Sequence, residues 1–172
     1  GDLEVSGAPG AMDVDPARQH LYASLRSTQE LAALRIDETT GKLTPINASA
    51  VGENAAYVKV DHTGKYLLSA YYGAGKVAVH EIADDGGLSE KPKQWVETAP
   101  KAHAIVPDPS NRFVFVPHTG PNKIFQFAFN QKHGKLTPNS MRFVESPAED
   151  EPRHIAFNPR VKFAYVDKEK RN

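Results

Sequence analysis

Residues 151–159 of the chain read Glu-Pro-Arg-His-Ile-Ala-Phe-Asn-Pro, and they open the fourth copy of a unit that the sequence repeats. Earlier copies start near residues 10, 56 and 103. Each copy has a short apolar segment, then an Asp or Asn turn, then a second apolar segment. A fixed period of this length is the sequence signature of a repeat architecture. The turn residues, which are 46 to 50 positions apart, are Asp15, Asp61, Asp108 and Asn158.

A second motif has the same period. Residues 40–45 read Thr-Gly-Lys-Leu-Thr-Pro, and residues 133–138 read His-Gly-Lys-Leu-Thr-Pro. A shortened form, Gly-Gly-Leu-Ser, stands at residues 86–89. All three fall late in their units, where glycine next to a polar residue indicates a tight hairpin turn.

Four strands are predicted in each unit. In the second unit they cover residues 56–60, 65–72, 76–82 and 94–98, and turn-forming residues separate most of them. No window holds a 3.6-residue apolar period for three turns, and residues 28–36 are expected to be a strand because of their place in the repeat. Units of this length with four strands are typical of propeller blades, whereas sandwiches do not repeat their sequence at this spacing. The sequence therefore predicts an all-β fold, a β-propeller of four-stranded antiparallel blades.

The chain is expected to be one partial propeller. Residues 1–172 form a single partial β-propeller domain, with repeat units starting near residues 10, 56, 103 and 153, which makes roughly three and a half blades. A propeller closes at 4 to 8 blades, so either the rest of the chain is missing or a second copy supplies it. Unpaired strand edges invite association, and self-association through the incomplete blades is expected.

Composition narrows the function classes. Lys plus Arg equals Asp plus Glu, 21 each, so no basic surface for nucleic acid is expected. No apolar run approaches a membrane span, and the first residues do not resemble a signal peptide, so cytoplasm is the expected compartment. There is no cysteine, and no two of the seven histidines have metal-ligand spacing. No cofactor and no metal are expected.

The repeat also predicts a site. His103 lies five residues before Asp108, and Arg153 lies five before Asn158, so both occupy the entry to the innermost strand of successive blades. Glu169 lies eleven after Asn158, at the exit of the next strand, which runs antiparallel to the innermost one. The three side chains are expected to meet at one end of the propeller axis. We expect Arg153 and Glu169 within about 3 Å of each other, with His103 farther away.

Structural explanations remain open for these residues. One alternative to a catalytic role is that Arg153 and Glu169 form an ion pair that only stabilises the fold. Another is that His103 is a hydrogen-bonded structural residue. His154 and His118 are expected to support the site by binding substrate. A further set is expected to pack between blades, namely Trp95, Tyr71 and Tyr72.

The chain resembles the lactonase family of seven-bladed propellers, whose best-known members are bacterial 6-phosphogluconolactonases and fungal 3-carboxy-cis,cis-muconate lactonizing enzymes. The resemblance covers all 172 residues, at about half the family's length, and is carried by residues 101–104, 108–117, 152–154 and 165–169. It implies that His103, Arg153 and Glu169 are the family's active-site histidine, first arginine and glutamate.

Two stretches depart from the family's pattern. The family usually has Asp-Leu-Gly where this chain has residues 118–120, His-Thr-Gly, and Val-Asn where it has Asp167 and Lys168. The family's second active-site arginine comes from a later blade, beyond residue 172, and little activity is expected from the 172-residue chain alone.

The resemblance implies hydrolysis of a small-molecule lactone, of the 6-phosphogluconolactonase type. Glu169 or His103 would be the base that activates water, and Arg153 would stabilise the oxyanion or hold an anionic group of the substrate. Two alternatives stay open, a carboxymuconate lactonizing enzyme that uses the same groups and a propeller that binds a ligand or protein without catalysis.

Overall fold

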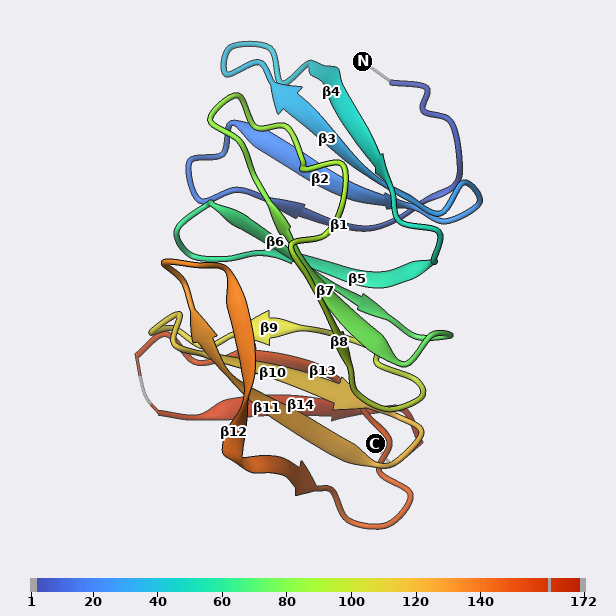
Figure 1. Ribbon diagram of the computed structural model, residues 1–172, viewed down its shortest axis with the longest axis vertical. Coiled ribbons are helices and arrows are strands. Elements are labelled where there is room, and N and C mark those ends of the chain that lie inside the picture. Colours follow the sequence, from blue (N-terminus) through green and yellow to red (C-terminus); the bar gives the residue numbers. More distant parts are fainter. Residues whose placement is uncertain (1–2, 161, 171–172) are drawn as a thin grey trace.

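The computed structural model describes residues 3–160 and 162–170, which form fourteen β-strands and no helix (Figure 1). No membrane-spanning helix is therefore found in this part of the chain. The strands form four antiparallel sheets, which we call blades 1 to 4. Blade 1 contains β1 (Pro9–Val14), β2 (His20–Leu25), β3 (Glu30–Ile36) and β4 (Leu43–Ala50). Blade 2 contains β5 (Ala55–Val60), β6 (Tyr66–Tyr71), β7 (Lys76–Glu81) and β8 (Gln94–Glu97). Blade 3 contains β9 (Val106–Pro107), β10 (Phe113–His118), β11 (Lys123–Asn130) and β12 (Lys135–Glu145). Blade 4 contains β13 (Pro152–Phe157) and β14 (Ala164–Lys168).

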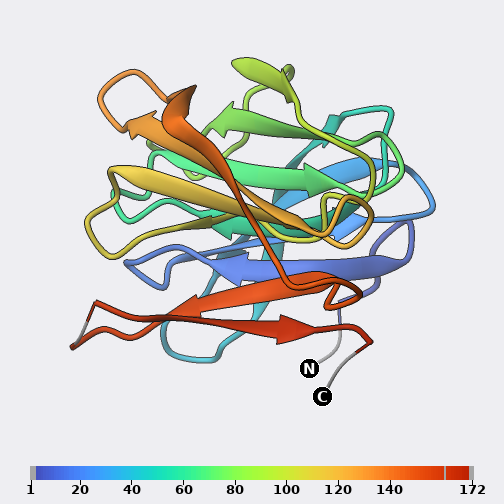
Figure 2. The same ribbon diagram turned by 90° about the horizontal axis from the view of Figure 1, so that it is seen from below.

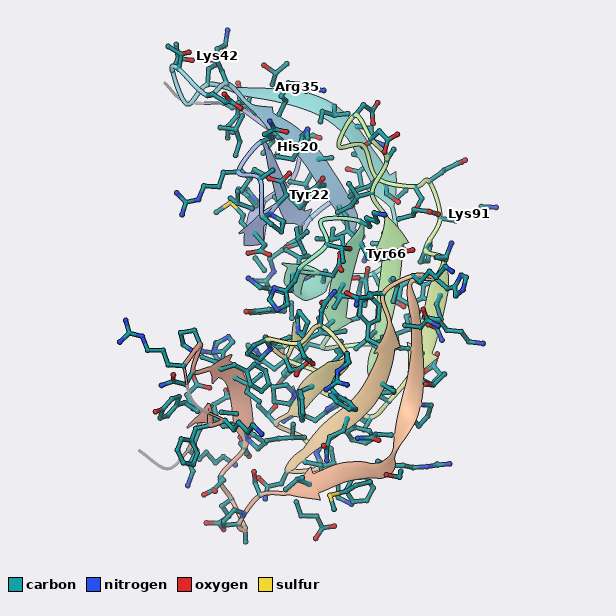
Figure 3. All side chains as sticks on the ribbon, turned by 90° about the vertical axis from the view of Figure 1, so that its left-hand side faces the viewer. His20, Tyr22, Arg35, Lys42, Tyr66 and Lys91 are labelled. Atoms are coloured by element: carbon teal, nitrogen blue, oxygen red, sulfur yellow. The ribbon has the colours of Figure 1, made fainter. Side chains whose placement is uncertain are left out.

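The blades follow one another along an arc, with β1, β5, β9 and β13 on its inner side (Figure 3). Apolar cores fill the space between neighbouring blades. Leu31 of blade 1 packs with Val58 and Leu67 of blade 2, and Leu68 of blade 2 packs with Ile105 of blade 3. The all-β propeller prediction is confirmed, as are the four strands predicted for the second unit and the strand predicted near residues 28–36.

Each repeated turn is closed by the side chain that defines it. Asp61 accepts hydrogen bonds from the backbone N–H groups of Lys65 and Tyr66 at 3.0 and 2.9 Å, and its own N–H donates to the Tyr66 carbonyl at 2.9 Å. Asp15 and Asp108 make the same set of bonds to the residues four and five positions later. This shared geometry aligns the first two strands of blades 1 to 3 in the same register.

Asp61 also joins two blades. Its carboxylate is fully buried and accepts a hydrogen bond from the Asn111 side chain of blade 3 at 2.8 Å. The Asn111 amide oxygen in turn accepts from the backbone N–H of His62 at 3.2 Å. The turn of blade 2 is thus fixed both within its blade and against the next one.

The hairpin glycines of one blade pack against the previous blade. A Cβ atom on Gly134 would lie 2.2 Å from the Tyr66 ring, and one on Gly86 would overlap His20 equally. Both glycines have a positive φ, 59° and 88°, in the left-handed region that favours glycine. The close approach explains why the hairpin motif has the same period as the Asp turns.

The two-stranded sheet of blade 4 presents exposed aromatic side chains. Within the described residues β14 has a neighbour on one side only (Figure 2). Phe163 and Tyr165 are 66% and 60% exposed. An open strand edge of this kind is a surface on which strands associate, and self-association of the chain stays a prediction.

Removing the Asp61 carboxylate should destabilise the fold strongly. In an Asp61→Ala variant, the buried N–H of Tyr66 and the part-buried N–H of Lys65 lose their acceptor, and the Asn111 amide loses one of its two acceptors. An unsatisfied buried donor is costly. We expect the free energy of unfolding, measured by urea denaturation, to fall by about 2 to 4 kcal/mol. The control is Asp84→Ala at an exposed position, and equal stability of the two variants would contradict this role.

Acid should destabilise the fold through His80. This side chain is fully buried, neither ring nitrogen has a hydrogen-bond partner among the described residues, and burial lowers its pKa to about 4. Between pH 6.5 and about 4 the unfolded chain binds a proton that folded His80 rejects. The free energy of unfolding should therefore fall as pH falls through this window, by up to about 1.4 kcal/mol per pH unit.

Urea denaturation across this pH range tests the contribution of His80. A His80→Leu variant should lose the part of the pH dependence that comes from this imidazole, whereas His133→Leu, at an exposed site, should keep it. The same slope in wild type and His80→Leu would count against the assignment.

Candidate active site

Every innermost strand is interrupted at the position five residues before its turn. The pairing of β1 with β2 shifts between Pro9 and Met12, that of β5 with β6 between Ala55 and Tyr57, and that of β13 with β14 between Pro152 and Ile155. In blade 3, Ala102 bridges His118, and regular pairing resumes only at Val106. β-Bulges redirect side chains and occur next to active sites. The residues inside these interruptions are Gly10, Ala56, His103 and Arg153.

All four of these positions line one cavity of about 790 Å³ on the inner side of the arc. A second set of residues directly follows the second strand of each blade, eleven positions after the turn. Three members of this set, Arg26, Tyr72 and Glu169, line the same cavity. The fourth, Thr119, is buried and donates a hydrogen bond to the Tyr72 hydroxyl at 3.5 Å.

Arg153 and His103 are in direct contact. The Arg153 Nε–H donates a hydrogen bond to His103 Nε2 at 3.0 Å. A guanidinium only donates, so His103 accepts with Nε2 and carries its hydrogen on Nδ1, as a neutral imidazole. Burial lowers the pKa of His103, and the charges of Arg153 and His154 lower it further, which outweighs the upward effect of Glu169.

This geometry corrects the expected one. His103, Arg153 and Glu169 do line a single cavity, but the close pair is Arg153 with His103 rather than Arg153 with Glu169. Backbone register brought the three residues together, whereas the bulge turned Arg153 toward the neighbouring blade. The two terminal nitrogens of Arg153 have no hydrogen-bond partner within residues 3–160 and 162–170, so they are available to a ligand.

His154 is held by Asp167. The Asp167 carboxylate accepts hydrogen bonds from the His154 backbone N–H and from His154 Nδ1, the latter at 3.1 Å. Because a carboxylate only accepts, Nδ1 carries the hydrogen, and Nε2 keeps a free lone pair. The His154 ring lies edge-on to the His103 ring at 4.8 Å and near the Tyr57 ring at 5.9 Å.

The residues that depart from the family's pattern before Glu169 are paired. Asp167 binds His154, and Lys168 Nζ lies 2.9 Å from a carboxylate oxygen of Asp150, whose side chain is buried. The Glu169 backbone N–H donates to the Glu151 carbonyl at 3.1 Å. Asp167 and Lys168 thus link the ends of β13 and β14. The Glu169 side chain still lines the cavity.

His118 does not reach the cavity. Its side chain is fully buried, Nδ1 lies 2.8 Å from the Val116 carbonyl, and Nε2 lies 2.9 Å from the Thr98 hydroxyl. Burial lowers its pKa to about 4. The expected contact with substrate is therefore not what the structure shows, because the side chain turns into the space between blades, next to the Phe125 ring. Its strand still positions His103, whose N–H donates to the Pro117 carbonyl at 3.0 Å.

The neighbouring tyrosines Tyr71 and Tyr72 have different surroundings. Tyr71 is buried against Trp95 at 4.9 Å between the ring centroids, as expected. Tyr72 instead lines the cavity, with its ring edge-on to His103 at 5.7 Å. Tyr72 was expected to pack between blades rather than to line a site, and Arg26 was not singled out. Both lie eleven residues after their turn, as Glu169 does.

Metal ligands do not gather in the described part of the chain, where no group of three or more His, Cys, Asp or Glu side chains is placed to hold an ion. The ionisable groups at the cavity are two guanidiniums, two imidazoles, two carboxylates and two phenols. Such a set can bind an anion, accept a proton and stabilise a developing negative charge.

A family model described as a lactonase, 7-bladed beta-propeller, matches residues 1–172. A 6-phosphogluconolactonase of Pectobacterium carotovorum is 31% identical over 163 residues, which is 95% of this chain and 48% of that protein. The 6-phosphogluconolactonase of Cronobacter sakazakii is 31% identical over 166 residues, covering 95% of this chain and 49% of that protein. The chain spans about half the length of these curated relatives.

Solved structures share the fold. The periplasmic gluconolactonase of Pseudomonas aeruginosa matches 98% of this chain and 53% of its own, with a TM-score of 0.87 and 23% identity. The β-propeller domain of Cps50 (Swd1) from Myceliophteria thermophila matches with a TM-score of 0.70 and 14% identity, over 94% of this chain and 50% of its own. At these identities the likeness concerns the propeller architecture.

Replacing Arg153 should raise the pKa of His103. Arg153→Met removes both the charge that disfavours the imidazolium and the hydrogen bond that favours the neutral ring. A histidine NMR titration should show the His103 pKa moving up toward its ordinary value in this variant. Arg142→Met, which removes an equal charge at an exposed site on β12, should leave it in place. Equal His103 pKa values in wild type and Arg153→Met would contradict the contact.

Proposed function

The chain belongs to the lactonase family of seven-bladed β-propellers, and on that premise we propose that its cavity is part of the active site of a lactone-ring hydrolase of the 6-phosphogluconolactonase type. The observation that carries the proposal is the cluster at the inner ends of blades 3 and 4. There Arg153, oriented by His103, shares a cavity with Glu169 and with His154, which is held by Asp167.

Ring opening needs an activated water and a stabilised oxyanion. Glu169 takes a proton from water as the water oxygen attacks the lactone carbonyl. The carbonyl oxygen gains negative charge, and the terminal N–H groups of Arg153 donate to it. When the ring C–O bond breaks, the proton held by Glu169 passes to the departing ring oxygen, and the product is the open-chain hydroxy acid.

His103 acts in this scheme as a positioning residue rather than as the base. Its Nε2 lone pair already accepts the hydrogen bond from Arg153, and burial, with the nearby charge of Arg153, lowers its pKa. A neutral imidazole in this place holds the guanidinium plane without neutralising it. Arg153 therefore keeps its full charge for the oxyanion.

His154 is a second proton acceptor at the cavity. Asp167 fixes its Nδ1 hydrogen and leaves Nε2 free, an arrangement in which a carboxylate orients an imidazole for proton transfer. Glu169 and His154 come from neighbouring strands of one blade and line the same cavity. The scheme assigns water activation to Glu169 and the orientation of the attacking water to His154.

The planar fork of Arg153 should be essential. Lysine keeps the charge, but it loses the Nε–H bond to His103 and the pair of parallel donors. In the full-length protein that contains this chain, Arg153→Lys should lower kcat/KM for 6-phosphogluconolactone by on the order of 100-fold. Formation of 6-phosphogluconate above the uncatalysed rate measures the activity.

Arg142→Lys, made on the exposed face of β12, is the matched control and should keep wild-type kinetics. Wild-type activity in Arg153→Lys would remove Arg153 from the mechanism. A full-length wild-type protein that does not accelerate hydrolysis of 6-phosphogluconolactone would overturn the proposed substrate. Assays with 3-carboxy-cis,cis-muconate would then separate a lactonizing enzyme from a propeller without catalysis.

A further inference from the structure

Arg26 occupies in blade 1 the position that Glu169 occupies in blade 4. Each residue directly follows the second strand of its blade, eleven positions after the turn residue. Their backbones match as well, since the Arg26 N–H donates to the Ala8 carbonyl at 2.8 Å and the Glu169 N–H donates to the Glu151 carbonyl at 3.1 Å. Both side chains line the same cavity. The repeat therefore places a cation at the first blade of the arc and a carboxylate at the last.

Gly10 makes room for the Arg26 side chain. A Cβ atom on Gly10 would lie 2.8 Å from Cδ and 3.0 Å from Cγ of Arg26, so the arginine stem crosses the place where a side chain would stand. Gly10 is the blade 1 equivalent of His103 and Arg153. At the position where blades 3 and 4 place His103 and Arg153, the space in blade 1 is taken by the side chain of Arg26.

The Arg26 guanidinium has no counter-ion among the described residues. Asp13, a carboxylate that also lines the cavity, is engaged by Lys59 Nζ at 2.9 Å and by the Val60 N–H at 2.8 Å. Glu169 belongs to the other end of the arc. Asn54 also lines the cavity, without a hydrogen-bond partner for its amide in the part of the chain that the structure describes. A guanidinium and an amide that line one cavity are a set of donors suited to an anion.

We propose that Arg26 binds the anionic substituent of the ligand, at the end of the cavity away from Arg153. The assignment rests on the proposed function, in which the reacting carbonyl lies between Arg153 and Glu169. A sugar-acid lactone with a terminal phosphate would place that phosphate toward blade 1, where Arg26 donates two parallel hydrogen bonds. Arg26 is then a specificity-determining residue, which separates phosphorylated from neutral lactones.

Binding measurements on the full-length protein test this assignment. The probes are 6-phosphogluconate, which has both the carboxylate and the phosphate, and gluconate, which lacks the phosphate. Isothermal titration calorimetry should show that Arg26→Gln weakens binding of 6-phosphogluconate about tenfold or more and leaves binding of gluconate unchanged. Arg142→Gln removes an equal charge away from the cavity and should change neither affinity. Unchanged binding of 6-phosphogluconate by Arg26→Gln overturns the assignment, as does an equal loss for both probes.

Kinetics separate this proposal from the one on which it rests. If the wild-type protein hydrolyses 6-phosphogluconolactone and Arg26→Gln has the same KM, the role of Arg26 is wrong and the lactonase function stands. A second outcome is that the wild-type protein shows no hydrolysis while Arg26→Gln binds 6-phosphogluconate more weakly than wild type does. In that case the lactonase function is wrong and the anion site stands. Both proposals are supported if the wild-type protein hydrolyses 6-phosphogluconolactone and Arg26→Gln has a raised KM with a nearly unchanged kcat. Equal melting temperatures of wild type and Arg26→Gln show that the variant is folded.

Discussion

The structure depends on one repeated interaction, the hydrogen bonds that an Asp side chain accepts from the backbone four and five residues later. In blade 2 this carboxylate is buried and also holds the next blade through Asn111. Because the turn fixes the register of the two strands beside it, it also fixes which residues stand at their far ends. The positions five before and eleven after the turn meet there, and all of them except Thr119 line the cavity.

The bulges turn this regular frame into a site. A regular strand would point successive side chains to the two faces of its sheet, whereas the interruptions around Gly10, Ala56, His103 and Arg153 turn these residues toward the arc's inner side. The backbone arrangement is similar in each blade, so the chemistry of the site depends on which residue type stands at each of the equivalent positions. Tyr72 and Glu169 show this for the second set, in which one blade supplies a phenol and another a carboxylate.

The sequence was enough to predict the blades and the meeting of His103, Arg153 and Glu169, because both follow from counting residues along a repeat. It did not predict the contact of Arg153 with His103, since register sets where a Cα lies and not which rotamer its side chain adopts. His118 was misplaced for a similar reason, because its position at a strand end gave no sign that its ring is buried beside Phe125. The sequence could also have indicated Arg26, because it lies eleven residues after its turn residue Asp15, as Glu169 does after Asn158.

A crystal structure of the full-length protein with 6-phosphogluconate bound would test the central claim most directly, namely that the two turn-defined positions of each blade form one ligand site. The account predicts the carboxylate of the ligand between the terminal nitrogens of Arg153 and Glu169, with His103 still bonded to Arg153 Nε, and the phosphate on Arg26. A ligand bound outside this cavity, or one whose carboxylate lies away from Arg153, would contradict it.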